Sequence, residues 1–333
     1  MAAERQGGHA ALEVKGLDVR IEGGGGSFLV VRDMAFAVAR GETLAIVGES
    51  GCGKSMTALS LLRLQPPAAT VERGTIAVEG QDVLAMPLAA LEDIRGDRIG
   101  MIFQEPLTAL NPVMTIGDQI AEALRRHRDI GRSAAARRAL DLLALVRMPD
   151  PDHRATLYPH QLSGGMRQRA MIALALSCDP AVLVADEPTT ALDVTIQAQI
   201  LGLIRNLQQR LGTALVLITH DLGVVAEMAD TVIVMYAGRR VEVAPVADLF
   251  DHPLHPYTLA LMRAAPHLDG AGGAKAPLLE IKGAVPPPWD MPQGCPFAPR
   301  CALTVDRCRT EDPPLAEKRD GHLAACWEIP DAA

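Results

Sequence analysis

One glycine-rich stretch contains residue types that suit phosphate binding. Residues 48–55 read GESGCGKS and fit the pattern G-x-x-x-x-G-K-S between a predicted strand and a predicted helix. In such a loop backbone N–H groups wrap the phosphates, Lys54 neutralises the β- and γ-phosphate oxygens, and Ser55 can ligate Mg²⁺. Lys54 is the only lysine between residues 16 and 274, so this match is specific. The residues predicted to bind the nucleotide here are Gly48, Glu49, Ser50, Gly51, Cys52, Gly53, Lys54, Ser55 and Met56.

Two adjacent carboxylates follow an apolar strand in the stretch AVLVADEP, residues 181–188. Ligands of parallel sheets bind at the carboxyl ends of the strands, where both acids lie. Neighbouring side chains on a strand point in opposite directions, so the two acids need not share a role. Asp186 suits Mg²⁺ binding through water, and Glu187 suits polarising an attacking water. As an isolated pair they would more often be a solvated strand end; the phosphate loop favours the functional interpretation.

Two further polar residues occupy similar positions. His220 ends the apolar run LVLITH, where a lone histidine is usually structural. Gln104 in GMIFQEP lies where the chain leaves the predicted α/β core for a helical segment. A polar side chain there is able to sense both the nucleotide and the helices.

A second anion-binding loop begins at residue 162 with LSGGMRQR. Ser163, Gly164 and Gly165 precede apolar residues at helical spacing, which predicts a loop opening onto a helix N-terminus. The free N–H groups of a helix N-terminus attract anions. The chain therefore holds two candidate phosphate sites more than a hundred residues apart.

The elements that position these residues predict an α/β protein. Strand-like runs begin the chain and return after residue 181, while about 106–177 is mostly helical, which indicates a phosphate-loop core with an N-terminal antiparallel β subdomain and a helical insert. Residues 230–244, DTVIVMYAGRRVEVA, are expected to form a closing hairpin. Composition changes near residue 250, where a linker-like DGAGGAKAP and a proline-rich stretch follow. We predict a domain over 1–250 and a small cysteine-containing extension over 251–333.

Composition narrows the function classes. Of the 333 residues, 49% are hydrophobic and only 3% aromatic, so aliphatic side chains must fill the core. A net charge of -8 disfavours nucleic-acid binding, which needs clustered basic residues. The sequence has no run of eighteen uncharged apolar residues and no secretory core at its N-terminus, which predicts a cytoplasmic protein.

In their order and spacing, GESGCGKS, FQEP, LSGGMRQR, VLVADEPTTALD and ITHD resemble the ATP-binding subunits of ABC transporters over about residues 12–250. The resemblance implies ATP as substrate, with Gln104 sensing Mg²⁺ and the attacking water, and His220 contacting the γ-phosphate. It also implies that Asp193 communicates across a dimer. In this family an aromatic side chain usually stacks on adenine, where this chain has Ile21, with Phe28 beyond the glycine run.

The same resemblance answers why there are two phosphate loops. In this family two nucleotide domains pack head to tail, so Ser163 and Gly165 of one subunit would bind the γ-phosphate held by Lys54 of the other. ATP would then hold the two subunits together, and hydrolysis would release them.

The tail HPLHPYTLALMRAAP, residues 252–266, followed by GCPFAPRC, resembles ATPases of the oligopeptide, dipeptide and nickel importer group. The motifs resemble its D-type subunit, which implies a heterodimer with an F-type ATPase, two transmembrane permeases and a solute-binding protein. The expected function is energising peptide uptake at the cytoplasmic face of the inner membrane. Nickel, opine or oligosaccharide uptake, and a soluble ABC-type ATPase acting on ribosomes or DNA, are the alternatives.

Four of the six cysteines, Cys295, Cys301, Cys308 and Cys326, lie in the tail at separations of six, seven and eighteen. The spacing lacks the C-x-x-C pairs of common zinc sites, and a reducing compartment disfavours disulfides. Four thiolates can hold a [4Fe–4S] cluster. The cysteine arrangement also resembles that of related importers, which implies such a cluster here. Zinc and free thiols remain alternatives.

Overall fold

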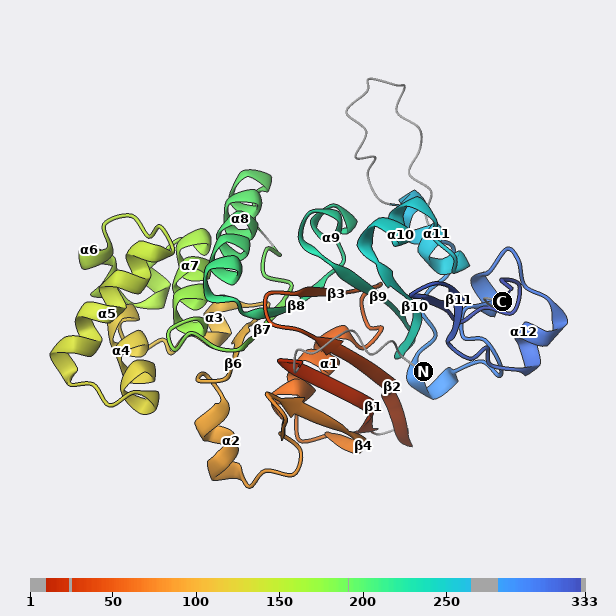
Figure 1. Cartoon of the computed structure of the whole chain (residues 1–333), viewed down its shortest axis with the longest axis horizontal. Coiled ribbons are helices and arrows are strands. Elements are labelled where there is room, and N and C mark those ends of the chain that lie inside the picture. Colours follow the sequence, from red (N-terminus) through yellow and green to blue (C-terminus); the bar gives the residue numbers. More distant parts are fainter. Residues whose placement is uncertain (1–9, 24–25, 191, 265–280, 331–333) are drawn as a thin grey trace, which may run out of the picture.

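Two β-sheets and a group of helices make up the computed structural model, which describes residues 10–23, 26–190, 192–264 and 281–330. The helical insert and the C-terminal extension lie at opposite ends of the longest axis, with the sheets between them (Figure 1). The predicted fold class is confirmed: an α/β core carries an antiparallel subdomain, a helical insert and a C-terminal extension. The linker-like stretch within 265–280 lies outside the described residues.

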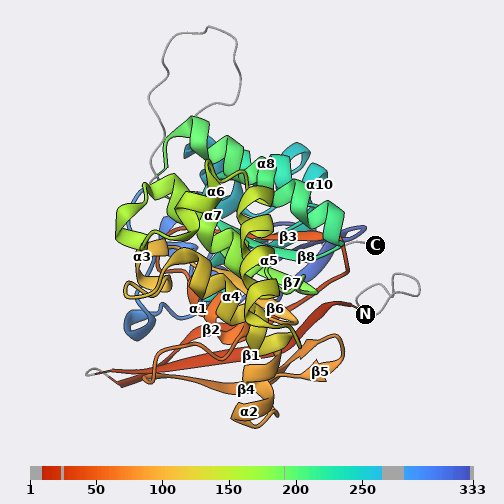
Figure 2. The same ribbon diagram turned by 90° about the vertical axis from the view of Figure 1, so that its left-hand side faces the viewer.

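The N-terminal sheet is antiparallel and lies beneath the central sheet (Figure 2). Its apolar side chains share one core with the central sheet and with the helix that follows the phosphate loop. Burial of this face is what holds the subdomain to the core. In spatial order its strands are β2 (Gly26–Val38), β1 (Leu12–Gly23), β4 (Ala69–Val78) and β5 (Gln81–Asp82).

Five parallel strands form one side of an eight-stranded sheet, the central sheet of the molecule. Almost every residue in these strands is buried, as expected for a parallel sheet covered on both faces. Their carboxyl ends share one edge, which brings together motifs that are far apart in sequence. The strands, in spatial order, are β9 (Thr231–Tyr236), β3 (Thr43–Val47), β8 (Ala214–Thr219), β7 (Val182–Asp186) and β6 (Ile99–Ile102).

The segment predicted to be mostly helical is confirmed as a group of helices with its own buried aliphatic side chains. These helices pack on the end of the sheet near β6 and β7 (Figure 1). The insert comprises α3 (Pro106–Ala109), α4 (Ile116–His127), α5 (Arg132–Leu145), α6 (Pro151–Ala155), η1 (Pro159–Gln161) and α7 (Gly164–Ala175). The remaining helices of the core are α1 (Lys54–Leu61), α2 (Leu88–Ile94), α8 (Val194–Leu211) and α9 (Leu222–Met228).

The C-terminal extension continues the central sheet. The hairpin of β9 and β10 is present as predicted, yet it does not close the sheet, because β12 pairs antiparallel with β10 and β11 pairs with β12. Pairing covers the edge that β10 would otherwise expose. The elements beyond β9 are β10 (Arg239–Pro245), α10 (Val246–Asp251), α11 (Pro256–Ala264), η2 (Pro288–Asp290), η3 (Ala298–Arg300), α12 (Asp306–Thr310), β11 (Ala316–Arg319) and β12 (His322–Ala324).

A buried glutamate joins the extension to the core. Glu242 of β10 is fully buried, and its Oε1 accepts hydrogen bonds from the Leu254 backbone N–H and from His322 Nε2, both at 2.7 Å. Its Oε2 accepts from the His255 backbone N–H at 2.9 Å and from the Thr258 hydroxyl. Both carboxylate oxygens are therefore satisfied, as burial of a charge requires.

Candidate functional site

The phosphate loop runs from the end of β3 to the start of α1, as predicted. Gly48 has φ 154° and a Cβ there would lie 2.2 Å from the Met235 carbonyl oxygen. At Gly53, with φ 103°, a Cβ would lie 2.6 Å from the Val30 carbonyl oxygen. Only glycine fits either position, because the backbone of the loop packs directly on neighbouring strands.

Lys54 lies within the loop that precedes it. Its side chain is buried, and Nζ donates to the carbonyl oxygens of Gly48 at 2.8 Å and Glu49 at 3.0 Å. These bonds satisfy a buried ammonium. The charge is thus placed at the centre of the loop, where phosphate oxygens would meet it.

Ser55 and Asp186 meet at the start of α1, although 131 positions separate them in sequence. The Ser55 hydroxyl donates to Asp186 Oδ1 at 3.2 Å. Burial raises the pKa of Asp186, and the hydrogen bond from Ser55 opposes that rise. Hydroxyl and carboxylate oxygens are ligands that Mg²⁺ prefers, so this pair fits the predicted magnesium site.

The three residues predicted to be catalytic converge at the edge of the sheet. Gln104 Nε2 donates to Glu187 Oε2 at 3.2 Å, and His220 Nδ1 lies 3.3 Å from Glu187 Oε1. Gln104 follows β6, Glu187 follows β7 and His220 follows β8, so strand order alone places them side by side. Glu187 is partly open to solvent, as a general base must be to reach water.

Thr190 is a fourth residue of this cluster that sequence reasoning missed. Its hydroxyl donates to Glu187 Oε2 at 2.8 Å. Glu187 has φ 45°, a left-handed conformation that is uncommon outside glycine and that clusters at functional sites. The three-residue spacing from Glu187 to Thr190 in EPTT is the signal that would have found it.

The second predicted loop is positioned by helix α7. The Ser163 hydroxyl accepts from the Met166 backbone N–H at 3.4 Å and caps the helix, while Ser163 and Gly164 are exposed. Helix α7 lies among the insert helices, on a different part of the molecule from α1 (Figure 1). Within one chain, the structure does not bring this loop to the phosphate loop.

Asp193 is the N-cap of α8. Its carboxylate accepts from the Ile196 backbone N–H at 2.9 Å. This local contact accounts for an acidic residue before the helix. Its communication across a dimer stays a prediction.

The residues beside the predicted adenine position lie across one hairpin. Ile21 of β1 pairs with Phe28 of β2. The Phe28 ring is 6.3 Å from the ring of Trp289, which comes from the C-terminal extension. Sequence reasoning did not place an extension residue here.

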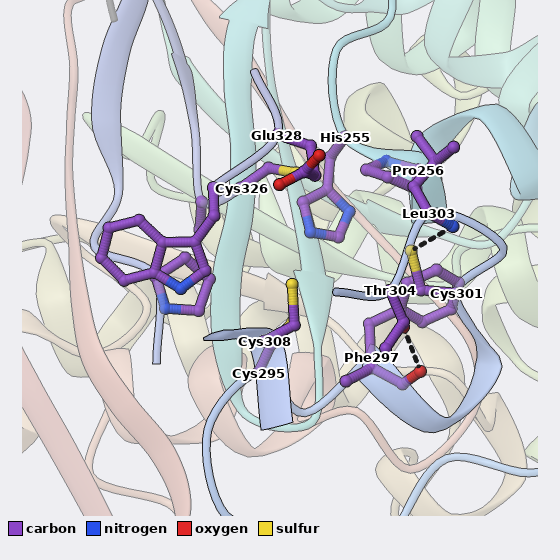
Figure 3. Close-up of a pocket in the computed structure, with 14 residues that line it drawn as sticks. His255, Pro256, Cys295, Phe297, Cys301, Leu303, Thr304, Cys308, Cys326 and Glu328 are labelled. Carbon is purple, nitrogen blue, oxygen red and sulfur yellow. Dashed lines mark hydrogen bonds between the residues drawn. The ribbon is translucent and has the colours of Figure 1, made fainter. Parts of the chain in front are cut away.

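The four tail cysteines line one cavity, together with His255 and Phe297 (Figure 3). Burial raises the pKa of the Cys295, Cys301 and Cys326 thiols. Within the described ranges, no group of three or more histidine, cysteine, aspartate or glutamate side chains is placed to hold a single metal ion. The cavity thus gathers four sulfur donors without surrounding one ion.

Comparisons with known families match both parts of the chain. Residues 31–190 match the family described as ABC transporter. Residues 241–308 match the family described as oligopeptide/dipeptide transporter, C-terminal region.

Curated relatives and solved structures agree with these matches. A probable peptide ABC transporter ATP-binding protein of Sinorhizobium fredii is 52% identical over 95% of this chain and 94% of its own length. The dipeptide transport ATP-binding protein DppD of Bacillus subtilis is 48% identical over the same shares. The dimeric post-hydrolysis structure of the ATP-binding cassette MJ0796 with ADP and Pi is 26% identical, with a TM-score of 0.64 over 71% of this chain and 98% of that one. The chain therefore belongs to the ATP-hydrolysing, ATP-binding subunits of ABC transporters, in the group with the oligopeptide/dipeptide C-terminal region.

Proposed function

We propose that the chain hydrolyses ATP to energise the import of di- or oligopeptides. The convergence of Gln104, Glu187 and His220 on one edge of the sheet, next to the Ser55 and Asp186 pair, carries the proposal. Relatives named for peptide, dipeptide and oligopeptide transport support peptides as the cargo.

Each residue of the cluster has a separate role in the proposed reaction. The phosphate loop binds the phosphates through its N–H groups and Lys54, and Ser55 and Asp186 would hold Mg²⁺. A bound Mg²⁺ neutralises charge that develops on the transferred phosphate. Glu187 accepts a proton from the attacking water. Gln104 and Thr190 hold the Glu187 carboxylate in place. His220 donates toward charge on the γ-phosphate.

The complete site is proposed to form between two subunits. Ser163 and Gly164 are exposed at the N-terminus of α7, where anions are favoured. The solved structures of MJ0796 are dimeric, which supports a dimer here. Ser163 and Gly165 would then complete a site whose Lys54 belongs to the other subunit, and Asp193 would lie near this contact. We propose an F-type paralogue as the partner.

Membrane partners are proposed to dock on the helical insert. None of the helices in the described segments has both the length and the apolar composition needed to span a bilayer. Leu107 and Val113, at the beginning of the insert, are 52% and 79% exposed. Exposed apolar side chains that follow Gln104 in the chain suit contact with a permease. We therefore place the subunit at the cytoplasmic face of the bacterial inner membrane, with two permeases and a solute-binding protein in the complex.

A [4Fe–4S] cluster is proposed for the cysteine-lined cavity. Zinc needs its sulfur ligands about 2.3 Å from one point, and the described residues do not surround such a point. A four-iron cluster is larger and takes one thiolate per iron, which suits four cysteines spread around a cavity. The iron atoms of the cluster would supply positive charge that keeps the buried cysteine thiols ionised. Anaerobically purified protein should be brown and lose its visible absorption on Cys301→Ser; a colourless protein with one zinc per chain would contradict the cluster.

Glu187→Gln tests the proposed reaction. The amide cannot accept the proton from water, so kcat for ATP hydrolysis should fall about 10²- to 10⁴-fold. ATP binding, measured by calorimetry, should persist because the phosphate loop is unchanged. Glu227→Gln, an exposed glutamate on α9, is the matched control and should leave kcat unchanged. Unaltered hydrolysis in Glu187→Gln would remove Glu187 from its proposed role.

A further inference from the structure

The beginning of the phosphate loop is contacted by two side chains of the C-terminal extension. The backbone N–H of Glu49 donates to the Tyr257 hydroxyl at 2.8 Å. The carboxylate of the same residue accepts from Arg300 Nη1 at 2.9 Å. These contacts join residues 208 and 251 positions apart in sequence. One loop residue is therefore held through both its backbone and its side chain.

Arg300 is held rigidly for this contact. Its side chain is only 5% exposed. Nε donates to the Lys282 carbonyl oxygen at 2.9 Å, Nη2 to the Ile281 carbonyl oxygen at 3.2 Å, and Nη1 also to the Tyr236 hydroxyl at 3.3 Å. A planar guanidinium with three fixed acceptors loses little further freedom when it binds Glu49.

Glu49 depends on this arginine. Its Oε1 is buried, and no described residue donates a hydrogen bond to that atom. Its Oε2 is the oxygen that Arg300 contacts. Without Arg300 a half-buried carboxylate at the loop would lack its charge partner, and the loop would have to move to solvate it.

A buried aromatic group connects the same loop to the cysteine-lined cavity. The rings of Tyr236 and Tyr257 are 4.7 Å apart, and Phe297 lies 5.2 Å from the first and 5.4 Å from the second. Phe297 also lines the cavity, and Arg300 precedes Cys301 directly. The cavity and the phosphate loop are therefore opposite ends of one packed contact.

We infer that Arg300 is a positioning residue of the nucleotide site, through which the C-terminal extension sets the affinity of the phosphate loop for nucleotide. By fixing Glu49, Arg300 and Tyr257 hold the loop in the conformation that presents its N–H groups to phosphate. The inference rests on the proposed nucleotide site. Any change that shifts η3, including a change at the cysteines beside it, would alter nucleotide binding without touching the nucleotide.

The test measures MgADP affinity by calorimetry for the full-length wild-type protein and for the full-length Arg300→Gln variant. The dissociation constant should rise about 10-fold, within the usual range of coupling between sites. In ATP hydrolysis, KM should rise similarly while kcat stays within about twofold, since the contact acts equally before and during the reaction. Arg300→Lys keeps the charge beside Glu49 and should recover most of the affinity.

Glu49→Gln supplies the decisive comparison. If Arg300 acts through Glu49, adding Arg300→Gln to the Glu49→Gln protein should change affinity little further. An equal loss in both backgrounds would overturn the inference. Tyr257→Phe keeps the buried ring and removes only the hydroxyl, so it should weaken MgADP binding in a protein that still folds; unchanged affinity there and in Arg300→Gln would also overturn it.

Two controls separate this inference from the nucleotide site itself. Arg309→Gln makes the same substitution at an exposed arginine of the extension and should leave affinity unchanged. Lys54→Ala should abolish binding. Binding that survives Lys54→Ala means that the proposed site is wrong, whereas loss in Lys54→Ala with no effect of Arg300→Gln means that only the role of Arg300 is wrong.

Discussion

Glu187 and Glu242 are two glutamates with opposite surroundings. Glu187, at the end of β7, is partly exposed and its contacts with Gln104 and His220 are long, at 3.2 and 3.3 Å. Glu242, in the middle of β10, is fully buried, and four donors satisfy both of its oxygens. The Glu187 carboxylate can still accept a hydrogen bond from water, whereas the Glu242 carboxylate cannot.

This difference distinguishes a carboxylate that takes part in the reaction from one that stabilises the fold. A carboxylate that must take a proton from water has to be reachable and incompletely satisfied. A carboxylate that joins two parts of a fold has to be saturated, because an unpaired buried charge is costly. Residue type alone does not distinguish them, and the four predictions below test the distinction.

The largest effect is expected for Glu242→Ala. Its four donors would lose their acceptor inside the fold, so the free energy of unfolding should fall by about 3–5 kcal/mol. Urea denaturation monitored by circular dichroism measures this change. Glu187→Ala is the matched comparison and should cost less than about 1 kcal/mol. Equal losses in the two variants would contradict the distinction.

The histidines beside these two glutamates, His220 and His322, show the same contrast in exposure. His220 is 63% exposed beside Glu187, and His322 is 1% exposed beside Glu242. His220→Ala should lower kcat for ATP hydrolysis about 10²-fold, the size expected for a lost donor to developing charge, and should leave stability nearly unchanged. His322→Ala should destabilise the protein while the folded fraction keeps its kcat. A reversal of these two outcomes would break the comparison.

Asp18 is an intermediate case, with a buried carboxylate and an exposed partner. Burial alone would raise its pKa, but hydrogen bonds from Arg73 and the Asp33 backbone outweigh burial and hold the pKa below 3.8. A lowered pKa in the folded state contributes stability above pH 3.8 that is lost as the pH falls through the folded value. Asp18→Asn should therefore lower the free energy of unfolding by about 1.5 kcal/mol at pH 7.

The pH dependence gives the check on Asp18. The difference between wild type and Asp18→Asn should shrink as the pH falls from 3.8 through the lower pKa of the folded state, because the folded wild-type carboxyl then becomes protonated and neutral. Unfolding titrations at several pH values measure it. A difference that stays constant into the acid range would show that charge is not its source.

The smallest effect on stability is expected for two helix caps in the insert. Ser163 caps α7 and Thr115 caps α4 through the same kind of hydrogen bond. Alanine at either position should cost about 1 kcal/mol of stability. Only Ser163→Ala should also slow ATP hydrolysis by the assembled dimer, because only that cap is proposed to meet nucleotide. Equal hydrolysis by both variants would confine Ser163 to a structural role.

Sequence patterns determined the local parts of this protein. The glycines, Lys54 and Ser55 belong to one strand, loop and helix, and the caps at Ser163 and Asp193 bond to backbone three residues away. Spacing within such short segments restricts the conformation strongly, so the phosphate loop, the capped loop and the helical insert were predictable. The carboxyl ends of predicted parallel strands also indicated which edge of the sheet would hold Asp186 and Glu187.

Only the tertiary structure decided which distant side chains meet. Gln104 reaches Glu187 across 83 positions and Arg300 reaches Glu49 across 251, and neither separation is visible as a pattern. These contacts depend on strand order, which places β3 between β8 and β9 and adds β12 beyond β10. Strand order is set by the packing of the whole core, and short-range hydrogen bonding does not encode it. The dependence of the phosphate loop on the C-terminal extension therefore follows from the fold.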